Sequence, residues 1–264
     1  MINFCSLYSS STGNCLFAQG PKTNILIDAG VSVRKIEQAL DSISVTPESI
    51  CGILVTHEHS DHTKGIGTFS KKYNVPVFAN IETWNAISSE QVDKISTENR
   101  KVFNVEEAFN IGELKVFPFG IPHDAANPCG FNLYQDTSKI SIATDLGHMT
   151  PSIFKNLEKS SFILLESNYE PEVLKFSKYP YVLKKRIDGP NGHLSNIIAG
   201  KTISKLIPLG LNTAMLGHLS KENNFPELAY KTVMEELEKG NISSKDISLS
   251  VASRTSPSSF IRVS

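Results

Sequence analysis

The sequence predicts a mixed α/β fold in which two β-sheets pack face to face and helices lie outside them. Two observations indicate this fold. Apolar strand patterns occur in two separate blocks, and each block is accompanied by helical patterns. The gaps between the expected elements are short, and no internal repeat or low-complexity linker occurs, so we expect a single domain over residues 1–264.

The first block opens the chain. Its segments alternate or run apolar and are separated by Ser, Gly and Pro, which predicts an antiparallel start followed by alternating helices and strands. The expected strands are Asn3–Tyr8, Asn14–Ala18, Asn24–Asp28 and Cys51–Thr56, and the expected helices are Val33–Leu40 and His62–Lys72, the latter begun by Asp61.

The second block begins with two expected hairpins, within Val102–Phe119 and Gly130–Thr144, that turn at Asn110–Gly112 and Asp136–Ser138. Helices and strands then alternate to the end of the chain. These are a helix at Pro151–Leu157, a strand at Phe162–Glu166, helical stretches up to Arg186, a helix at Ser195–Leu206, a strand at Thr213–Leu216, a helix at Pro226–Lys239 and a strand at Ile247–Ala252.

The composition is that of a globular protein with one sizeable core, at 40% hydrophobic and 20% charged residues. The 26 basic and 27 acidic residues give a net charge of -1, so a polyanion would have to be bound by a local patch or by metal ions. No stretch approaches the roughly 20 apolar residues of a membrane span, and the start MINFCSLYSS lacks a signal-peptide pattern, so we expect a cytoplasmic protein that does not bind membranes.

The four cysteines predict neither a thiolate zinc site nor a disulfide framework. They are widely scattered without CxxC spacing, and we expect them to be reduced and buried. They are Cys5, Cys15, Cys51 and Cys129.

The seven histidines are unevenly distributed, because His57, His59 and His62 lie within the run LVTHEHSDH. Two histidines at positions i and i+2 of a loop can bind one metal ion, while Asp61 and His62 can turn toward a second ion. The alternative is a polar surface loop that happens to be rich in histidine. Glu58 alternates out of the ligand row, and we expect it to be solvated or to support the ligands.

Three further residues of ligand type follow apolar strands: His123, Asp145 and His218. Each one alone would be read as an ordinary core or loop residue, since strands commonly end in polar residues. All three residues, however, lie at equivalent positions, and the histidine loop alone has too few ligands for two ions. Together they predict a dinuclear metal site in which the Asp145 carboxylate can bridge both ions.

The HEHSDH run with these later residues resembles the metallo-β-lactamase superfamily signature over nearly the whole chain. The resemblance implies a four-layer αββα sandwich. It also implies one metal ion held by His57, His59, His123 and Asp145, and another held by Asp61, His62, Asp145 and His218. Asp28, in ILIDAG, matches an aspartate that supports the metal loop without binding metal, although a turn or cap before Gly30 is an equally good interpretation.

Other stretches are similar to the YycJ (WalJ) group, which is described as DNA-directed 5′-to-3′ exonucleases. They are SSSTGNC from Ser9, SIATDLG from Ser141, LLESNYE from Leu164, NGHLSN from Asn191 and LGHLSKENN from Leu216. The order of these stretches also resembles RNase Z, which implies that His193 is a histidine that assists phosphate chemistry without binding metal. Tyr169 and His148 depart from the group's pattern, and we expect His148 to be incidental and partly exposed.

The residues themselves also point to a phosphate site near His193, because it precedes a helix start whose N–H groups favour an anion. Helix capping and loop packing are the alternative. The basic cluster of Lys184, Lys185 and Arg186 lies just upstream and would supply a local positive patch, although such a run is usually a solvated face. The substrate contacts we expect are Ser11, Asn14, Asn168, Lys185, Arg186, Ser195, Asn196 and Asn223.

The sequence therefore predicts a metal-dependent phosphodiesterase acting on nucleic acid, most consistent with DNA, through water that bridges two Zn²⁺ or Mn²⁺ ions, with Fe²⁺ also acceptable. Asp61 and His193 are the expected catalytic residues. The alternatives are a thioester or small-ester hydrolase of glyoxalase II type, an RNA-processing endonuclease, and a non-catalytic metal-binding regulatory module. An exported β-lactamase does not fit a chain without a signal-peptide pattern.

Overall fold

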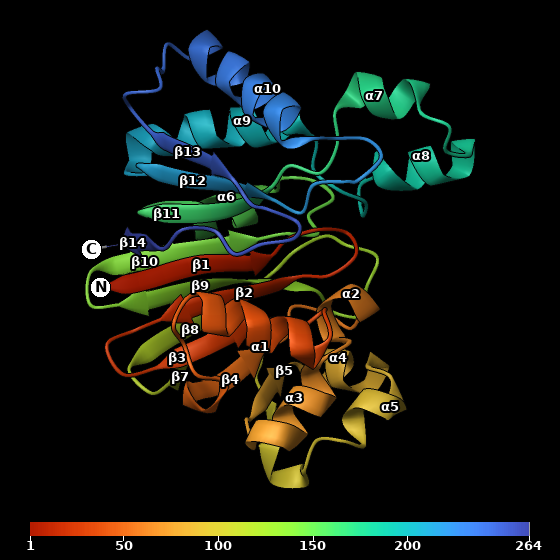
Figure 1. Cartoon of the computed structure of the whole chain (residues 1–264). Coiled ribbons are helices and arrows are strands. Elements are labelled where there is room, and N and C mark those ends of the chain that lie inside the picture. The colour runs from red at the N-terminus through yellow and green to blue at the C-terminus, as the bar shows by residue number, and fades with distance from the viewer. Residues whose placement is uncertain (264) are drawn as a thin grey trace. The chain divides into compact units, whose positions relative to one another are not determined.

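Figure 1 shows the protein as a computed structural model, which describes residues 1–263. The chain divides into two compact units. Unit 1 contains residues 1–120, 125–138 and the described chain from residue 253, and unit 2 contains residues 121–124 and 139–252. We describe each unit in turn, and the interpretation of residues 1–264 as a single domain stays a prediction.

The described chain contains two mixed sheets of seven strands each. The first sheet has the order β14 (Ile261–Val263), β1 (Ile2–Tyr8), β2 (Cys15–Gln19), β3 (Asn24–Ile27), β4 (Ile50–Leu54), β5 (Val77–Ala79) and β6 (Arg100–Val102). The second has the order β13 (Ser248–Val251), β12 (Thr213–Gly217), β11 (Phe162–Glu166), β10 (Ser138–Ala143), β9 (Cys129–Gln135), β8 (Leu114–Gly120) and β7 (Phe109–Ile111).

Unit 1 contains the whole first sheet, and its β1–β3 segment is antiparallel, as the sequence predicts. From β3 onward the strands are parallel, and Ile27 pairs with Leu54, so the carboxyl ends of β3 and β4 meet at the same edge. Residues that follow these two strands are therefore neighbours in space, although they lie far apart in the sequence.

Within unit 1 the first sheet packs against the β7–β9 strands through aromatic rings. Phe78 of β5 stacks on Phe109 of β7 with ring centroids 5.7 Å apart, and Phe103 stacks on Phe109 at 5.3 Å. Phe103 also meets Phe131 of β9 edge to face at 5.7 Å. Face-to-face packing of two sheets is thus confirmed within this unit.

The helices of unit 1 are α1 (Val33–Ser42), α2 (Ser60–Thr63), α3 (Ile66–Tyr73), α4 (Ile81–Ala86) and α5 (Ser89–Val92), with short 3-10 helices at Pro47–Ser49 and Thr97–Asn99. The prediction of one helix over His62–Lys72 is wrong, because α2 and α3 are separate. The backbone N–H of Gly65 donates to the Ala29 carbonyl at 2.7 Å, and a Cβ at Gly65 would lie 2.4 Å from the Val31 carbonyl oxygen. This close approach to another segment interrupts the helix.

In unit 2, strands β10 to β13 are all parallel. The helices of this unit are α6 (Pro151–Leu157), α7 (Pro171–Phe176), α8 (Tyr181–Ile187), α9 (Asn196–Leu206) and α10 (Pro226–Lys239), with a 3-10 helix at Ile207–Leu209. Helices α9 and α10 pack side by side (Figure 1). The predicted bounds of α6, β11 and α10 are confirmed.

Three of the four cysteines are buried, as expected, and all four are free thiols. Cys51 is the exception, because its side chain is exposed near the start of β4. Among residues 1–263, none of the helices is both long enough and apolar enough to cross a membrane.

Candidate active site

The histidine loop of unit 1 is held by an aspartate that follows the neighbouring strand. The Asp28 carboxylate accepts hydrogen bonds from the backbone N–H and the hydroxyl of Thr56, both at 2.9 Å. It also lies 2.7 Å from Nδ1 of His62, which is fully buried. Because carboxylates commonly fix the orientation of metal-binding imidazoles in this way, Asp28 is placed to support a ligand.

The imidazole rings of this loop gather at one point. The ring centroid of His57 lies 4.6 Å from that of His59 and 4.1 Å from that of His62. Nδ2 of Asn14 lies 3.0 Å from Nε2 of His62 and 3.4 Å from a carboxylate oxygen of Asp61. Asn14 therefore contacts the site residues directly.

Gly30 allows this loop to approach the strand-end segment closely. A Cβ at this position would lie 1.5 Å from the backbone oxygen of Asp61, so no other residue fits without moving the helix that carries Asp61 and His62. Glu58 points elsewhere, because its carboxylate accepts a hydrogen bond from the backbone N–H of Ala126 at 2.9 Å.

A second group of site residues lies at the carboxyl edge of the parallel strands in unit 2. Asp145 lies two residues after β10, Glu166 ends β11, and His218 directly follows β12. The three strand ends are level, because Leu165 of β11 pairs in register with residues at the ends of both β10 and β12. In open α/β sheets this edge is where ligands bind.

Glu166 connects the side chains of this group. One of its carboxylate oxygens accepts from Nδ1 of His193 at 2.8 Å and from Nδ1 of His218 at 2.7 Å. The other oxygen accepts from the backbone N–H groups of Leu146 at 2.6 Å and Leu194 at 3.1 Å. Glu166 is fully buried, so these four bonds compensate for the lost hydration of its charge.

The charges of Glu166 and His193 stabilise each other. Burial alone would raise the pKa of the Glu166 carboxyl, but the two histidines lower it below its ordinary value. Burial alone would lower the pKa of His193, but the Glu166 carboxylate outweighs this effect and the net pKa is raised. The contact with Glu166 therefore favours the protonated form of the His193 imidazole.

His123 and Asp145 lie beside this pair. Nε2 of His123 is 3.6 Å from an Asp145 oxygen, while its Nδ1 is 3.2 Å from the backbone oxygen of Gly192. Burial lowers the pKa of His123, which favours the neutral imidazole that binds metal. Asp145, Glu166, His193 and His218 each offer one ligand-type atom, and these atoms all lie within 4.8 Å of one another.

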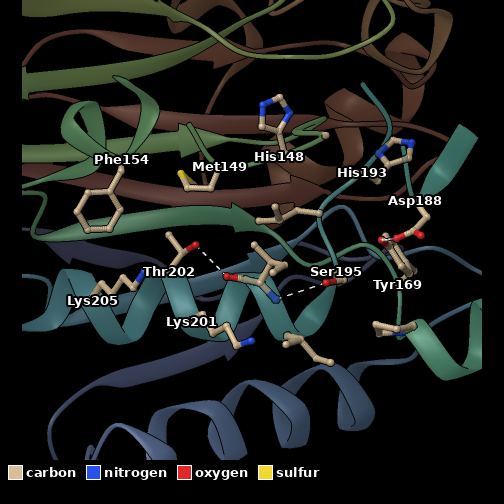
Figure 2. Close-up of a pocket in the computed structure, with 15 residues that line it drawn as sticks. His148, Met149, Phe154, Tyr169, Asp188, His193, Ser195, Lys201, Thr202 and Lys205 are labelled. Carbon is tan, nitrogen blue, oxygen red and sulfur yellow. Dashed lines mark hydrogen bonds between the residues drawn. The ribbon is translucent and has the colours of Figure 1, made fainter. Parts of the chain in front are cut away.

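A cavity of about 620 Å³ opens beside His193 within unit 2 (Figure 2). Its wall combines the start and one face of α9 with His148, which is exposed and has Nδ1 2.8 Å from the Pro190 carbonyl oxygen. Figure 2 shows Lys201 and Lys205 on α9, further along the same wall. The cavity therefore joins His193 to two lysines.

Three expected substrate contacts are buried in the protein. Asn168 donates to the backbone oxygen of His218 at 2.7 Å. Asn196 and Asn223 are fully buried, and Nδ2 of Asn196 donates to Glu170 at 2.9 Å. These contacts favour a structural role over contact with substrate.

The remaining expected contacts differ in exposure. Ser11 is exposed, whereas Ser195 is buried, caps α9 by accepting from the N–H of Ile198 at 3.4 Å and lines the cavity beside His193. Arg186 donates to Asp124 at 2.6 Å, in an ion pair next to His123. Lys185 lies on the solvent side of α8.

Glu166 is a residue of the candidate site that sequence reasoning did not assign. The available signal was a charged residue ending an otherwise apolar strand, FILLE, which is fully buried in the structure. Such a glutamate requires strong partners, and those partners are two histidines from later in the chain.

The two groups of residues match the donors that divalent metal ions prefer. The loop of unit 1 offers three imidazoles and the Asp61 carboxylate, and the strand ends of unit 2 offer His123, His218 and Asp145. In each group a carboxylate fixes Nδ1 of a histidine, through Asp28 for His62 and through Glu166 for His218.

Comparison with known proteins agrees with this arrangement. Residues 23–219 match the β-lactamase superfamily domain. The chain belongs to the β-lactamase superfamily. Its two mixed seven-stranded sheets and their helices match the αββα sandwich fold of this superfamily, so the predicted fold class is confirmed.

Within the β-lactamase superfamily, the predicted resemblance to the YycJ (WalJ) group is also confirmed. The chain is 35% identical over 237 residues to exodeoxyribonuclease YycJ of Bacillus anthracis, covering 90% of this chain and 89% of that protein. It is 33% identical over 237 residues to exodeoxyribonuclease WalJ of Streptococcus pneumoniae, covering 89% and 88%. The chain is a metal-dependent hydrolase.

Two solved structures share the fold of this chain at low sequence identity. Zn²⁺-bound PqqB of Methylobacterium extorquens has a TM-score of 0.73 at 13% identity, covering 98% of this chain and 99% of that chain. The short form of human tRNase Z has a TM-score of 0.64 at 14% identity, with the same coverage.

Proposed function

We propose that the protein is a dinuclear metal-dependent exodeoxyribonuclease that removes nucleotides from the 5′ end of DNA. The observation that carries the proposal is the Glu166 bridge, in which one carboxylate oxygen lies 2.8 Å from Nδ1 of His193 and 2.7 Å from Nδ1 of His218, a histidine of the expected ligand set. The sequence relatives named as exodeoxyribonucleases support DNA as the substrate.

Seven residues would hold the metal ions. His57, His59, His123 and Asp145 would bind one ion, and Asp61, His62, His218 and the same Asp145 carboxylate would bind the other. Zn²⁺ and Mn²⁺ both suit this mixture of imidazole and carboxylate, and Fe²⁺ is also compatible with it. When bound, two such ions lower the pKa of water and neutralise the charge of the phosphate oxygens.

The protein's own residues would orient the reactants and move the proton. Asp61 would orient the attacking water toward phosphorus. His193, held at Nδ1 by Glu166, would donate a proton from its other nitrogen to the phosphate or to the leaving oxygen. The P–O bond to that oxygen breaks as the new P–O bond forms, and Asp28 would keep His62 in place throughout.

The proposed substrate also gives the protein its place in the cell. The relatives named as exodeoxyribonucleases come from bacteria, whose DNA lies in the cytoplasm. By analogy, this protein would trim DNA ends in the cytoplasm, as a step of DNA repair. A substrate with a phosphate on every nucleotide would also make activity strongly dependent on salt.

The proposal is tested with Asp61→Ala and wild-type protein, each loaded with Mn²⁺ or Zn²⁺. We expect the variant to lose more than about 100-fold of its activity on 5′-labelled DNA, because even residues that only orient metal ligands are worth 10–100-fold. Circular dichroism would show that the variant is folded. Wild-type nuclease activity in metal-loaded Asp61→Ala would contradict the mechanism.

A substrate panel separates the proposal from its rivals. Single- and double-stranded DNA labelled at the 5′ or the 3′ end, RNA and a thioester are assayed in parallel at low and high salt. We expect release of labelled nucleotide from the 5′ end of DNA and strong inhibition by salt. Faster turnover of the thioester or of RNA would replace DNA as the substrate, and absence of turnover on the whole panel would indicate a regulatory module.

A further inference from the structure

Helices α7 and α8 form a helical hairpin in unit 2, which we call the arm (residues 171–187; Figure 1). The arm has a small apolar core of its own. This core contains Tyr169, Leu174 and Ile187, with Tyr179 and Leu183 packed against them. The hydroxyl of Tyr169 donates to Asp188 at 2.6 Å, which ties the residue before the arm to the residue after it.

A groove of about 450 Å³ lies between the two helices of the arm, and we call it the arm groove. Its apolar lining includes Pro171, Leu174 and Tyr181. Its charged lining has three basic residues and two acidic ones, namely Lys175, Lys184, Lys185, Glu172 and Asp188. A groove of this volume is large enough for a ligand the size of a nucleotide.

The Tyr181 ring is 72% exposed, which is unusual for a large aromatic side chain that lines a groove. Nζ of Lys185 lies 5.6 Å from the ring centroid, and Nζ of Lys184 donates to the backbone oxygen of Lys175 at 2.7 Å. An accessible ring with an ammonium group beside it suits single-stranded nucleic acid, because a base can stack on the ring while a phosphate meets the charge.

The charge of the arm differs from that of the chain. Residues 171–187 contain five basic residues and one acidic residue, Glu172, in a chain whose net charge is -1. Glu172 pairs with Lys175 at 3.6 Å, and both side chains are well exposed. The local excess of positive charge favours a polyanion over an uncharged peptide as the ligand of the groove.

The arm groove adjoins the cavity beside His193. The two hollows share Tyr169, Pro171 and Asp188 in their linings, and all of these residues belong to unit 2. A chain molecule with its reacting phosphate at His193 would therefore extend into the arm groove within one or a few nucleotides.

We infer that the arm groove binds an unpaired segment of the nucleic acid substrate, with a base stacked on Tyr181 and phosphates contacting Lys175, Lys184 and Lys185. This inference rests on the proposed function. Stacking on a single exposed ring requires an unpaired base, so the groove selects single-stranded over double-stranded ends.

Binding is measured first, without catalysis, as the affinity of wild-type protein and Tyr181→Ala for fluorescent 20-mer oligothymidylate in EDTA. We expect Tyr181→Ala to bind about 5-fold or more weakly and Tyr181→Phe to bind as wild type, because base stacking needs only the ring. A plot of the logarithm of the binding constant against the logarithm of the salt concentration should be less steep for Lys185→Gln. The slope should change by about one, the value for one phosphate contact.

Two equally exposed residues of the arm serve as matched controls. Phe176 is 77% exposed and has Nζ of Lys175 5.1 Å from its ring, but it lies outside the arm groove, and Val182 is 78% exposed on α8. Phe176→Ala and Val182→Ala should bind the oligonucleotide as wild type. If Phe176→Ala weakens binding as much as Tyr181→Ala does, the groove is not the site.

Cleavage is then compared on a 20-mer and on a 4-mer with Mn²⁺. We expect Tyr181→Ala to lower the cleavage rate of the 20-mer relative to that of the 4-mer. Damage to folding would lower both rates by the same factor. The inference would be overturned if Tyr181→Ala and wild type had the same affinity for the 20-mer and the same ratio of 20-mer to 4-mer cleavage rates. The proposed function would still stand in that case, provided that the wild type cleaves DNA. If wild type cleaves no polynucleotide, the proposed function fails, and loss of oligonucleotide binding in Tyr181→Ala would still support the groove.

Discussion

Glu166 serves two histidines with a single carboxylate oxygen and two backbone N–H groups with the other. The sequence alone signals that Glu166 is unusual, because a glutamate at the end of a fully buried strand must have polar partners. The partners are not predictable from local patterns, since His193 and His218 lie 27 and 52 residues away.

Substitution of Glu166 by glutamine tests whether the carboxylate orients the two histidines. The amide removes the negative charge and places an N–H₂ group where an acceptor is needed. We expect nuclease activity to fall by about 10–100-fold, the usual cost of losing a group that orients metal ligands. Activity and bound metal are measured together at a single metal concentration.

Glu170→Gln is the matched control for this substitution. Glu170 lies four residues along the chain, and its carboxylate accepts from Asn196 at 2.9 Å and from Thr232 at 2.8 Å. We expect this variant to retain near wild-type activity. Equal activity in Glu166→Gln and wild type would show that the bridge to His193 and His218 is not needed.

Three residues that follow strands share a backbone conformation that sequence patterns do not reveal. Asp28, Asp145 and His218 have φ values of 60°, 57° and 56°, in the left-handed region that non-glycine residues seldom adopt. Such conformations cost roughly 1–3 kcal/mol and cluster at functional sites. The sequence predicts that these residues follow strands. It does not predict the left-handed backbone conformation that sets the direction of each side chain.

At the scale of elements, strong end signals gave accurate predictions. Pro151 and Pro226 stand at the first positions of α6 and α10, where the missing N–H of proline costs nothing, and both helices have the predicted bounds. Strands β5, β6 and β14 were not predicted. Each has only three residues, which is too short to establish a period of two.

The contact between α9 and α10 depends on Gly200. A Cβ at this position would lie 2.7 Å from Cβ of Glu236 and 3.2 Å from Cα of Val233. Alanine has a helix propensity better than glycine by about 1 kcal/mol, but the overlap forces the helices apart. We expect Gly200→Ala to lower the free energy of unfolding by about 1–3 kcal/mol, measured by urea denaturation.

A surface variant of the same helix pair distinguishes packing from a general effect of alanine. Glu238 is exposed on α10, and Glu238→Ala should change stability by less than about 0.5 kcal/mol. If Gly200→Ala left the free energy of unfolding unchanged or raised it, the close contact between α9 and α10 would not limit stability. The better helix propensity of alanine would then outweigh any loss of packing.

At the scale of the whole molecule, the proposed ligands and one of their two supports could be predicted from the sequence, and the other support could not. The HEHSDH run is local, and the later ligands follow apolar strands that pattern alone can find. Asp28 was expected to be a support from the family resemblance. Glu166 becomes recognisable as a support only when parallel strands place their carboxyl ends at one edge, because the pairing register is not written in any single segment.

Metal binding should stabilise the folded protein as a whole. The proposed ligands of each ion are far apart in the sequence and come together only in the folded chain, so the ions would bind the folded state in preference to the unfolded one. Ligand at 100 times its dissociation constant adds about 2.7 kcal/mol to the free energy of unfolding. For a chain of this length we expect Zn²⁺ or Mn²⁺ to raise Tm by several degrees over the protein in EDTA.

Differential scanning calorimetry with matched histidine variants assigns that rise to the proposed ligands. His59→Ala removes a proposed ligand and should abolish most of the metal-induced rise, whereas His148→Ala, outside the ligand set and bonded to the Pro190 carbonyl, should retain it. The same rise in both variants would place the stabilising metal elsewhere. An identical Tm for wild type with metal and in EDTA would contradict metal binding by this chain, since any ion that prefers the folded state must raise its stability.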